Sequence, residues 1–377
     1  MARKVVERNI AYDDVKLKYY VTLDYGKNEY NKRIKKTKTF EKIADARKCL
    51  RNFEVEKDNQ NIILPKKETV ESYFRYWLND IKSVSCKPAT LYGYSNIIDN
   101  HIIPFIGKVE LQKLTAKHIN GYCAHLKKDK KLDNNTIKKH QDLLKSMLKT
   151  ATNEKIIHEN FMENMELIKN KHREVAVYNQ EQVQQLFKLI KGHPLELGVK
   201  LALYLGLRRG EINGLKWKNV HLQEKYIYIV DTRTQAGKNE YRGDTKTDMS
   251  KRTLELSSEL VELLKRTKEK QEEDKRLFGK SYYDTDYVFR KPNGKLYRVN
   301  YLSATFKIFL DKNSLPRIKF HALRHTCATM ANKMGITLYD IASMLGHSSP
   351  SITSKIYTHQ LDKTNSKATM AVADAYR

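Results

Sequence analysis

Apolar residues recur along the chain at two different spacings, and the change between them divides the sequence. In the first part, residues 16–26 and 31–40 read as strands, because apolar or β-branched side chains alternate with polar ones on either side of a turn at Gly26. The next segment has apolar residues at helical spacing: Ile43, Ala46, Leu50 and Phe53. We therefore expect a small N-terminal three-stranded β-sheet with one packed helix within residues 1–62.

Helical spacing takes over after a polar linker that contains Pro65. The first apolar face there is formed by five residues: Tyr73, Phe74, Trp77, Leu78 and Ile81. Pro88 suits the first turn of a second helix, Thr115 suits the cap of a third, and a fourth begins near Asn135. This pattern predicts a helical domain over residues 66–172.

The remainder, residues 174–377, predicts a mixed and mainly α domain. A buried helix is expected first, then a break at Gly206 and a second helix that begins at the following arginines. Strands are expected over residues 225–234 and, with the alternation of a hairpin, over 241–256; a charged helix follows at 257–274. The expected fold class is therefore multidomain α+β.

The chain is strongly basic along its whole length. Its formal net charge is +27, and each predicted part contributes: 16 basic against 10 acidic side chains in residues 1–65, 20 against 12 in 66–173, and 35 against 22 in 174–377. A distributed excess of this size suits a protein that wraps a polyanion, and favours nucleic acid over a generic solubility charge.

The cysteines and the N-terminus point to a reducing compartment. The four cysteines are far apart and form no CxxC pair: Cys49, Cys86, Cys123 and Cys327. A disulfide framework or a zinc knuckle is not expected from them. The chain starts without an apolar signal segment and has no long apolar run. We expect a soluble protein of the cytoplasm.

Candidate chemistry concentrates near the C-terminus. Cleavage of a phosphodiester without a metal needs a nucleophile, cations on the phosphate oxygens and a proton donor for the leaving oxygen. Arg208 and Arg324 are candidate clamps, because a guanidinium meets two phosphate oxygens and keeps its charge. Tyr357, with His347 upstream, is a candidate nucleophile. On its own, Arg208 could be a surface residue and Arg324 could be structural, and Tyr357 is one of 23 tyrosines.

A metal site is the alternative for the histidines in this region. His321 and His325 lie four residues apart, a spacing that metal ligands use on a helix. The segment has no glutamate between the histidines and no cluster of cysteine or carboxylate ligands nearby. The expected site therefore contains no metal and no cofactor.

Taken together, four short motifs resemble the signature of the tyrosine recombinases, the phage integrase family. They occur in the order of that family: GLRRGE (206–211), HALRH (321–325), LGH (345–347) and IYTH (356–359). The predicted layout is similar as well. The resemblance implies an arm-site DNA-binding domain at 1–62, a core-binding domain at 66–172 and a catalytic domain at 174–377.

The resemblance also implies a role for each motif residue. Tyr357 would attack the scissile phosphate and form a 3′-phosphotyrosyl bond. Arg208 and Arg324 would bind the non-bridging oxygens, and His321 and His347 would complete the pocket and assist proton transfer. Glu211 would support Arg208, while His325 and His359 would have packing or supporting roles. Lys246 matches the hairpin lysine that protonates the leaving 5′-oxygen, with Lys238 and Lys251 as competing choices.

The expected function is a site-specific DNA recombinase, the integrase of a mobile element, acting in integration and excision. The family implies double-stranded DNA with core and arm sites as substrate, a homotetramer on DNA, and an excisionase and a host DNA-bending protein as partners. Two alternatives stay open. One is a relaxing enzyme like a type IB topoisomerase, and the other is a non-catalytic DNA-binding regulator with the same fold.

Overall fold

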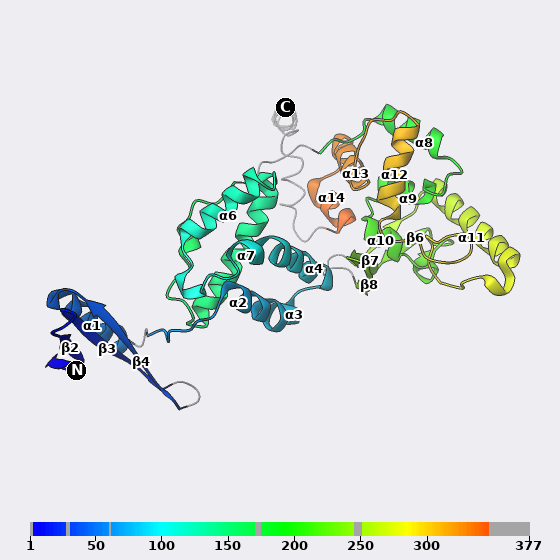
Figure 1. The fold of residues 1–377 in the computed structure, drawn as a ribbon. Helices are drawn as coiled ribbons and strands as arrows, with labels where there is room; N and C mark the ends of the chain where they lie inside the picture. Colours follow the sequence, from blue (N-terminus) through cyan, green and yellow to red (C-terminus); the bar gives the residue numbers. More distant parts are fainter. Residues whose placement is uncertain (1–2, 28–30, 60–61, 170–174, 245–250, 347–377) are drawn as a thin grey trace, which may run out of the picture. The chain divides into compact units, whose positions relative to one another are not determined.

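The computed structural model describes residues 3–27, 31–59, 62–169, 175–244 and 251–346 (Figure 1). The chain divides into two compact units, residues 1–171 and 172–377, which are described separately below. None of the described helices combines the length and the apolar composition that spanning a bilayer requires.

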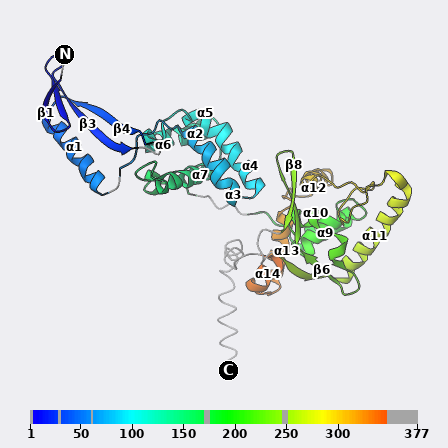
Figure 2. The same cartoon turned by 90° about the horizontal axis from the view of Figure 1, so that it is seen from below.

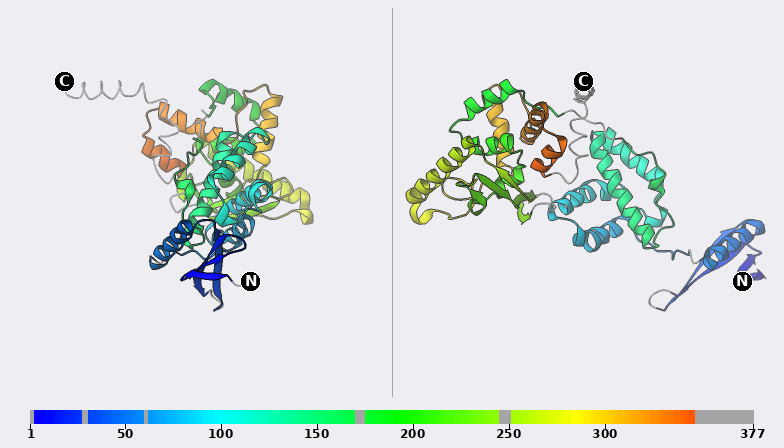
Figure 3. Two further views of the ribbon diagram at one scale, coloured as in Figure 1. Left: turned by 60° about the vertical axis from the view of Figure 1, so that its left-hand side comes forward. Right: turned by 180° about the vertical axis from the view of Figure 1, so that it is seen from behind.

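The first unit begins with a four-stranded antiparallel sheet. Its strands pair in the order β1-β2-β3-β4, with these bounds: β1 (Lys4–Glu7), β2 (Ile10–Asp13), β3 (Lys18–Lys27) and β4 (Arg33–Phe40). Helix α1 (Ile43–Asp58) lies across one face of the sheet (Figures 1 and 3). The core between them is formed by Ile10, Val21 and Leu23 from the sheet and by Ala46 and Phe53 from α1. The predicted helix is therefore present, and its apolar residues face the sheet.

The predicted three-stranded sheet has one strand more than expected. The two predicted segments correspond to β3 and β4, whereas β1 and β2 had no predicted range. Strand β1 pairs with β2 through a turn at Asn9, whose backbone is left-handed with φ of 69°. Asparagine tolerates this conformation better than most residues. The strand is short and mostly exposed, so it carries no apolar alternation by which it could be recognised in the sequence.

The helical part of the first unit follows the predicted periodicity closely. Its helices are α2 (Val70–Tyr76), α3 (Ser83–Ser85), α4 (Pro88–Ile97), α5 (Ile103–Ile106), α6 (Ala116–Lys128) and α7 (Asn134–Asn153). Two wider π-helical segments, η1 (Trp77–Lys82) and η2 (Ile98–Ile102), continue α2 into α3 and α4 into α5. Thr115 caps α6 and Asp133 caps α7. Trp77 and Tyr122 are fully buried in this core.

The second unit contains the site. Its helices are α8 (Gln180–Ile190), α9 (Glu196–Tyr204), α10 (Arg209–Gly214), α11 (Ser258–Phe278), α12 (Tyr301–Lys312), α13 (Ala322–Lys333) and α14 (Leu338–Leu345). Its strands are β5 (Val220–His221), β6 (Tyr226–Ile229), β7 (Asp231–Ala236), β8 (Asn239–Asp244) and β9 (Arg252–Glu255). Helices α9 and α13 pack side by side within this unit (Figure 2).

The strands of this unit pair differently from the hairpin expected over residues 241–256. Strand β8 pairs with β7, whereas β9 joins β6 in a sheet of order β5-β6-β9. The expected segment thus belongs to two sheets. Alternation identified the strands, but it carries no information about which strand each one pairs with. The mixed, mainly α class itself is as expected.

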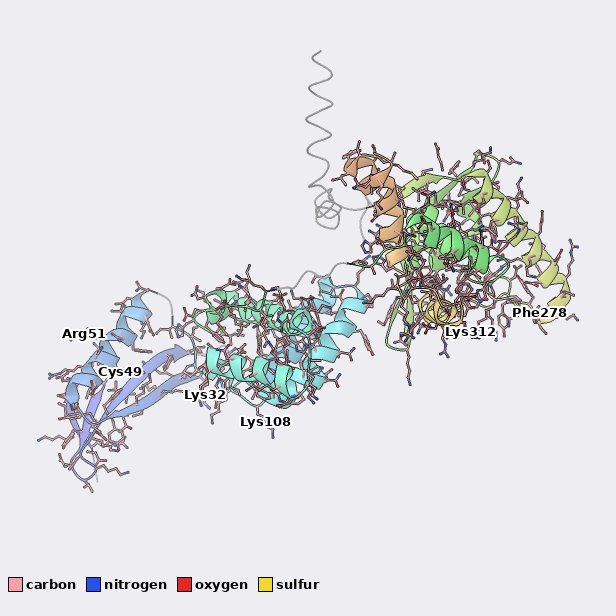
Figure 4. All side chains as sticks on the ribbon, turned by 90° about the horizontal axis from the view of Figure 1, so that it is seen from above. Lys32, Cys49, Arg51, Lys108, Phe278 and Lys312 are labelled. Carbon is pink, nitrogen blue, oxygen red and sulfur yellow. The ribbon has the colours of Figure 1, made fainter. Side chains whose placement is uncertain are left out.

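Exposed basic side chains occur on every part of the molecule. Examples are Lys32 beside the N-terminal sheet, Arg51 on α1, Lys108 in the helical part and Lys312 at the end of α12 (Figure 4). The charge excess of the sequence is therefore spread over the folded surface of each part.

Candidate active site

The first candidate arginine lies at a sharp break between two helices. Helix α9 ends before Gly206, whose backbone is left-handed with φ of 62°. This conformation favours glycine, and a Cβ atom at this position would also force the Leu345 side chain to move. Arg208 follows in an extended conformation and is the cap residue of α10. The break therefore lets the Arg208 side chain leave the end of the helix.

Hydrogen bonds to Glu211 fix the position of Arg208. The Glu211 carboxylate accepts a hydrogen bond from Nη1 of Arg208 at 2.8 Å and another from the Arg208 backbone N–H at 2.9 Å. The Glu211 side chain is 1% exposed, whereas that of Arg208 is 35% exposed. Arg208 is thus fixed on its inner side and accessible on its outer side.

Arg324, the second candidate arginine, is more deeply buried than Arg208. It lies on α13 and is 3% exposed. Its Nη1 donates to the carbonyl of Gly206 and its Nη2 to the carbonyl of Leu345, both at 2.6 Å. Arg324 therefore links the break after α9 to the end of α14.

Three arginines from three elements meet at the C-terminal end of α14. Three successive carbonyls there each accept one guanidinium hydrogen bond: Met344 from Nε of Arg252 at 2.7 Å, Leu345 from Nη2 of Arg324 at 2.6 Å, and Gly346 from Nη2 of Arg208 at 3.2 Å. The last carbonyls of a helix have no partner within it, and the helix dipole makes this end negative. The three guanidinium groups supply donors to these carbonyls, and their positive charge is favourable at the negative end of the helix.

His321 and His325 lie on the first turn of α13, beside Arg324. Their rings meet edge to face, with centroids 5.1 Å apart. Burial first, then the neighbouring His325 and Arg324, lower the pKa of His321 to about 4. Burial and Arg324 lower the pKa of His325 as well. Part of the His321 residue still meets solvent, while neighbouring atoms surround its ring. The ring is neutral at pH 7, with one nitrogen able to donate and one able to accept a hydrogen bond.

The electrostatics of the cluster favour an anion. Burial first, then the charge of Arg208, lower the pKa of Arg324 to about 9. Burial raises the pKa of Glu211, but the charges of Arg252 and Arg208 outweigh this effect, so the net shift is downward and Glu211 stays ionised. Among the described residues, Arg324 forms no ion pair. A bound phosphate would relieve the repulsion between Arg324 and Arg208.

Arg252 is a member of this cluster that the sequence analysis missed. It is the first residue of β9 and shares one strand face with Leu254 and Leu256, which are buried. Its Nη1 and Nη2 lie 3.3 and 3.0 Å from the two oxygens of Glu211. The available signal was an arginine on the apolar face of an alternating strand, because a buried charge requires a partner.

The remaining predicted residues lie mostly outside the described part of the chain. Lys246, His347, Tyr357 and His359 are among them. Of the competing lysines, Lys238 lies in the turn between β7 and β8, and Lys251 directly precedes β9. Within the described ranges no group of three or more potential metal ligands occurs.

Comparison with known proteins gives a consistent picture. Residues 177–364 match the phage integrase family, and residues 69–127 match the phage integrase N-terminal SAM-like domain. A protein of Caldanaerobacter subterraneus subsp. tengcongensis named "Tyrosine recombinase XerC-like" is 28% identical, with 95% of this chain and 96% of that protein covered.

Two solved structures show the same fold. The Tn1549 transposon integrase in complex with a circular intermediate DNA has a TM-score of 0.70 at 18% identity, covering 81% of this chain and 99% of that one. A lambda integrase tetramer bound to a Holliday junction has a TM-score of 0.59 at 18% identity, covering 94% and 96%. The expected multidomain fold class, family and enzyme class are confirmed. The chain belongs to the phage integrase family of tyrosine recombinases.

Proposed function

We propose that this protein is the integrase of a mobile element, which cuts and rejoins DNA at specific sites through a 3′-phosphotyrosyl intermediate. The observation that carries the proposal is the convergence of Arg208, Arg324 and His321. Arg208 reaches the end of α14 from the cap of α10, and Arg324 reaches it from α13, which also carries His321. Two guanidinium groups beside a neutral imidazole suit a pentacoordinate phosphate.

Each residue has a distinct task in the proposed reaction. Arg208 and Arg324 bind the non-bridging oxygens of the scissile phosphate and stabilise the charge that grows on them. The phenol of Tyr357 passes its proton to a histidine of the pocket as its oxygen attacks phosphorus, the bond to the 5′-oxygen breaks, and Lys246 supplies a proton to that oxygen. His321 and His347 hydrogen-bond the phosphate and assist the proton transfers. Attack by a 5′-hydroxyl of a partner strand reverses the step, so no external energy source is needed.

The domain roles and partners form part of the same proposal. Residues 1–62 bind arm sites, residues 66–172 bind core sites and residues 174–377 catalyse. The protein works as a homotetramer on double-stranded DNA, with an excisionase and a host DNA-bending protein setting the direction. The basic surface of each part supports binding to DNA, and the similarity to a lambda integrase tetramer on a Holliday junction supports the assembly.

A suicide substrate tests the chemistry. Duplexes are made from the DNA that flanks the gene and nicked near each candidate crossover, so that the short released strand diffuses away and the adduct accumulates. We expect an SDS-stable protein–DNA adduct with the unaltered protein and none with Tyr357→Phe. Tyr283→Phe, at a tyrosine that is 51% exposed, is the matched control and should react normally. An adduct formed equally by Tyr357→Phe would refute the assignment of the nucleophile.

A further inference from the structure

Glu211 is a buried carboxylate shared by two arginines from different elements. Its Oε1 lies 2.8 Å from Nη1 of Arg208 and 3.3 Å from Nη1 of Arg252. Its Oε2 accepts from the Arg208 backbone N–H at 2.9 Å and from Nη2 of Arg252 at 3.0 Å. Both oxygens are thus shared between the cap of α10 and the start of β9.

The two arginines differ in what they can reach. The Arg208 side chain is 35% exposed and Arg252 only 7%. Arg208 therefore presents a face to a ligand, whereas Arg252 lies behind Glu211. All three guanidinium nitrogens of Arg252 donate to Met344 or to Glu211, so Arg252 acts on a substrate through these neighbours.

Arg252 has a second attachment, to the end of α14. Its Nε donates to the carbonyl of Met344 at 2.7 Å. Gly346 adopts a left-handed conformation beside it, and a Cβ atom on Gly346 would lie 3.0 Å from Nη1 of Arg252. The planar Arg252 guanidinium thus sets the distance between Glu211 and the C-terminal end of α14. The carbonyls at that end accept hydrogen bonds from Arg208 and Arg324.

We propose that Arg252 is a positioning residue for phosphate cleavage, which holds the Arg208 guanidinium in its working orientation through Glu211 and through the end of α14. This inference rests on the proposed function. The planar fork matters here, because lysine offers a point charge that cannot contact Met344 and both Glu211 oxygens in the same geometry. Arg252→Lys therefore keeps the charge and loses the positioning.

Single-turnover cleavage of the suicide substrate tests this role in the full-length protein. With DNA saturated by enzyme, we expect Arg252→Lys to form adduct about 10- to 100-fold more slowly, since a displacement near 1 Å costs a factor of this order. The dissociation constant for the same DNA should change less than about twofold, because the Arg252 side chain is only 7% exposed and is paired with Glu211. Arg276→Lys, at an exposed arginine on α11, is the matched control and should cleave as the unaltered protein does.

A substrate with a neutral scissile linkage separates positioning from general support of the fold. A methylphosphonate replaces one non-bridging oxygen, so the site has less charge for Arg208 to neutralise. If Arg252 acts through Arg208, the rate defect of Arg252→Lys should shrink several-fold on this substrate. A defect of equal size on both substrates, or a cleavage rate within about twofold of the unaltered protein, would overturn the inference.

Two further results distinguish a failure of this inference from misfolding of the variant and from a failure of the proposed function. If Arg252→Lys does not fold, as judged by its thermal melting, Glu211→Gln breaks the same bridge and is compared on the same two substrates with the same criteria. If the unaltered protein forms no adduct, the proposed function fails. An active protein with a normal Arg252→Lys variant refutes only the inference on Arg252.

Discussion

Arg324 donates a hydrogen bond to the carbonyl of Gly206 at 2.6 Å, across 118 positions of sequence. The same guanidinium reaches the carbonyl of Leu345 at an equal distance. The Arg324 side chain thus connects two segments. One is the break after α9, which precedes Arg208, and the other is the C-terminal end of α14, which precedes His347 in the sequence. The residues proposed to bind one phosphate are thus linked by contacts to the backbone of distant segments.

Replacing Arg324 should affect stability and catalysis together. Arg324→Ala leaves two buried carbonyls without a donor, at a cost of about 1–3 kcal/mol for each such group in the free energy of unfolding. It also removes a proposed phosphate ligand. We expect a lower melting temperature and no detectable adduct with the suicide substrate. Normal cleavage by Arg324→Ala would exclude Arg324 from the clamp.

Arg324→Lys separates the two effects. The lysine keeps a positive charge in the pocket but cannot reach two carbonyls and a phosphate from one planar group. We expect its melting temperature to lie between those of Arg324→Ala and the unaltered protein, while cleavage stays strongly impaired. Differential scanning calorimetry and the adduct assay on the same preparation make this comparison.

Gly206→Ala should destabilise the second unit. The left-handed backbone costs about 1–2 kcal/mol for a residue with a Cβ, and the new methyl group would collide with Leu345. Adding Leu345→Ala should relieve the collision but not the backbone strain, so the double variant should not recover the original melting temperature.

A helical glycine provides the control for that experiment. Gly121 on α6 has no positive φ, and a Cβ atom added to it would have nothing within 4 Å. Gly121→Ala should therefore raise helix stability slightly, by about 0.5–1 kcal/mol. If Gly206→Ala melts at the temperature of the unaltered protein, the argument for a required glycine fails.

Acid should weaken the helical part of the first unit through His140. Its ring nitrogen Nδ1 lies 2.7 Å from the hydroxyl of Tyr122, its ring packs 5.0 Å from that of His101, and it is 1% exposed. Burial first, then His101, lower the pKa of His140 to about 4. Below pH 6.5 the unfolded chain binds a proton that the folded protein does not. Stability therefore falls as the pH drops from about 6.5 to 4, by up to about 3 kcal/mol.

Denaturation in urea at several pH values checks this expectation. The fluorescence of Trp77 reports on the same core in a Trp217→Phe background. His140→Gln keeps a polar neutral side chain for Tyr122 and has no proton to gain. The midpoint of unfolding should then vary less between pH 6.5 and 4, and an unchanged pH dependence would rule out His140 as its source.

Removing residues 1–62 should separate arm binding from cleavage. The N-terminal sheet and α1 have their own core, built on Ile10, Val21, Leu23, Ala46 and Phe53. The helical part has another, around Trp77 and Tyr122. We expect the truncated protein to cleave a core-site suicide substrate but to integrate DNA poorly in an assay that requires arm sites. Full integration without residues 1–62 would contradict the two-site proposal.

Local pattern was enough to predict most elements of this protein. Thr115 and the apolar spacing after it gave the start of α6, and Pro88 gave the start of α4, because caps and first-turn residues act within a few positions of themselves. Short motifs likewise predicted Arg208, His321 and Arg324 as site residues, and the structure brings the two arginines to the end of α14. The strand β1 was missed because it is short and largely exposed on both faces.

The tertiary structure decided which distant residues come together. Nothing near Arg252 in the sequence indicates that it meets Glu211, 41 positions away. Nor does the sequence indicate that arginines from the cap of α10, from β9 and from α13 donate to three consecutive carbonyls at the C-terminal end of α14. The pairing of β8 with β7 and of β9 with β6 was equally hidden. A sequence pattern states which side of an element is buried, whereas the partner of a buried charge depends on which elements pack together.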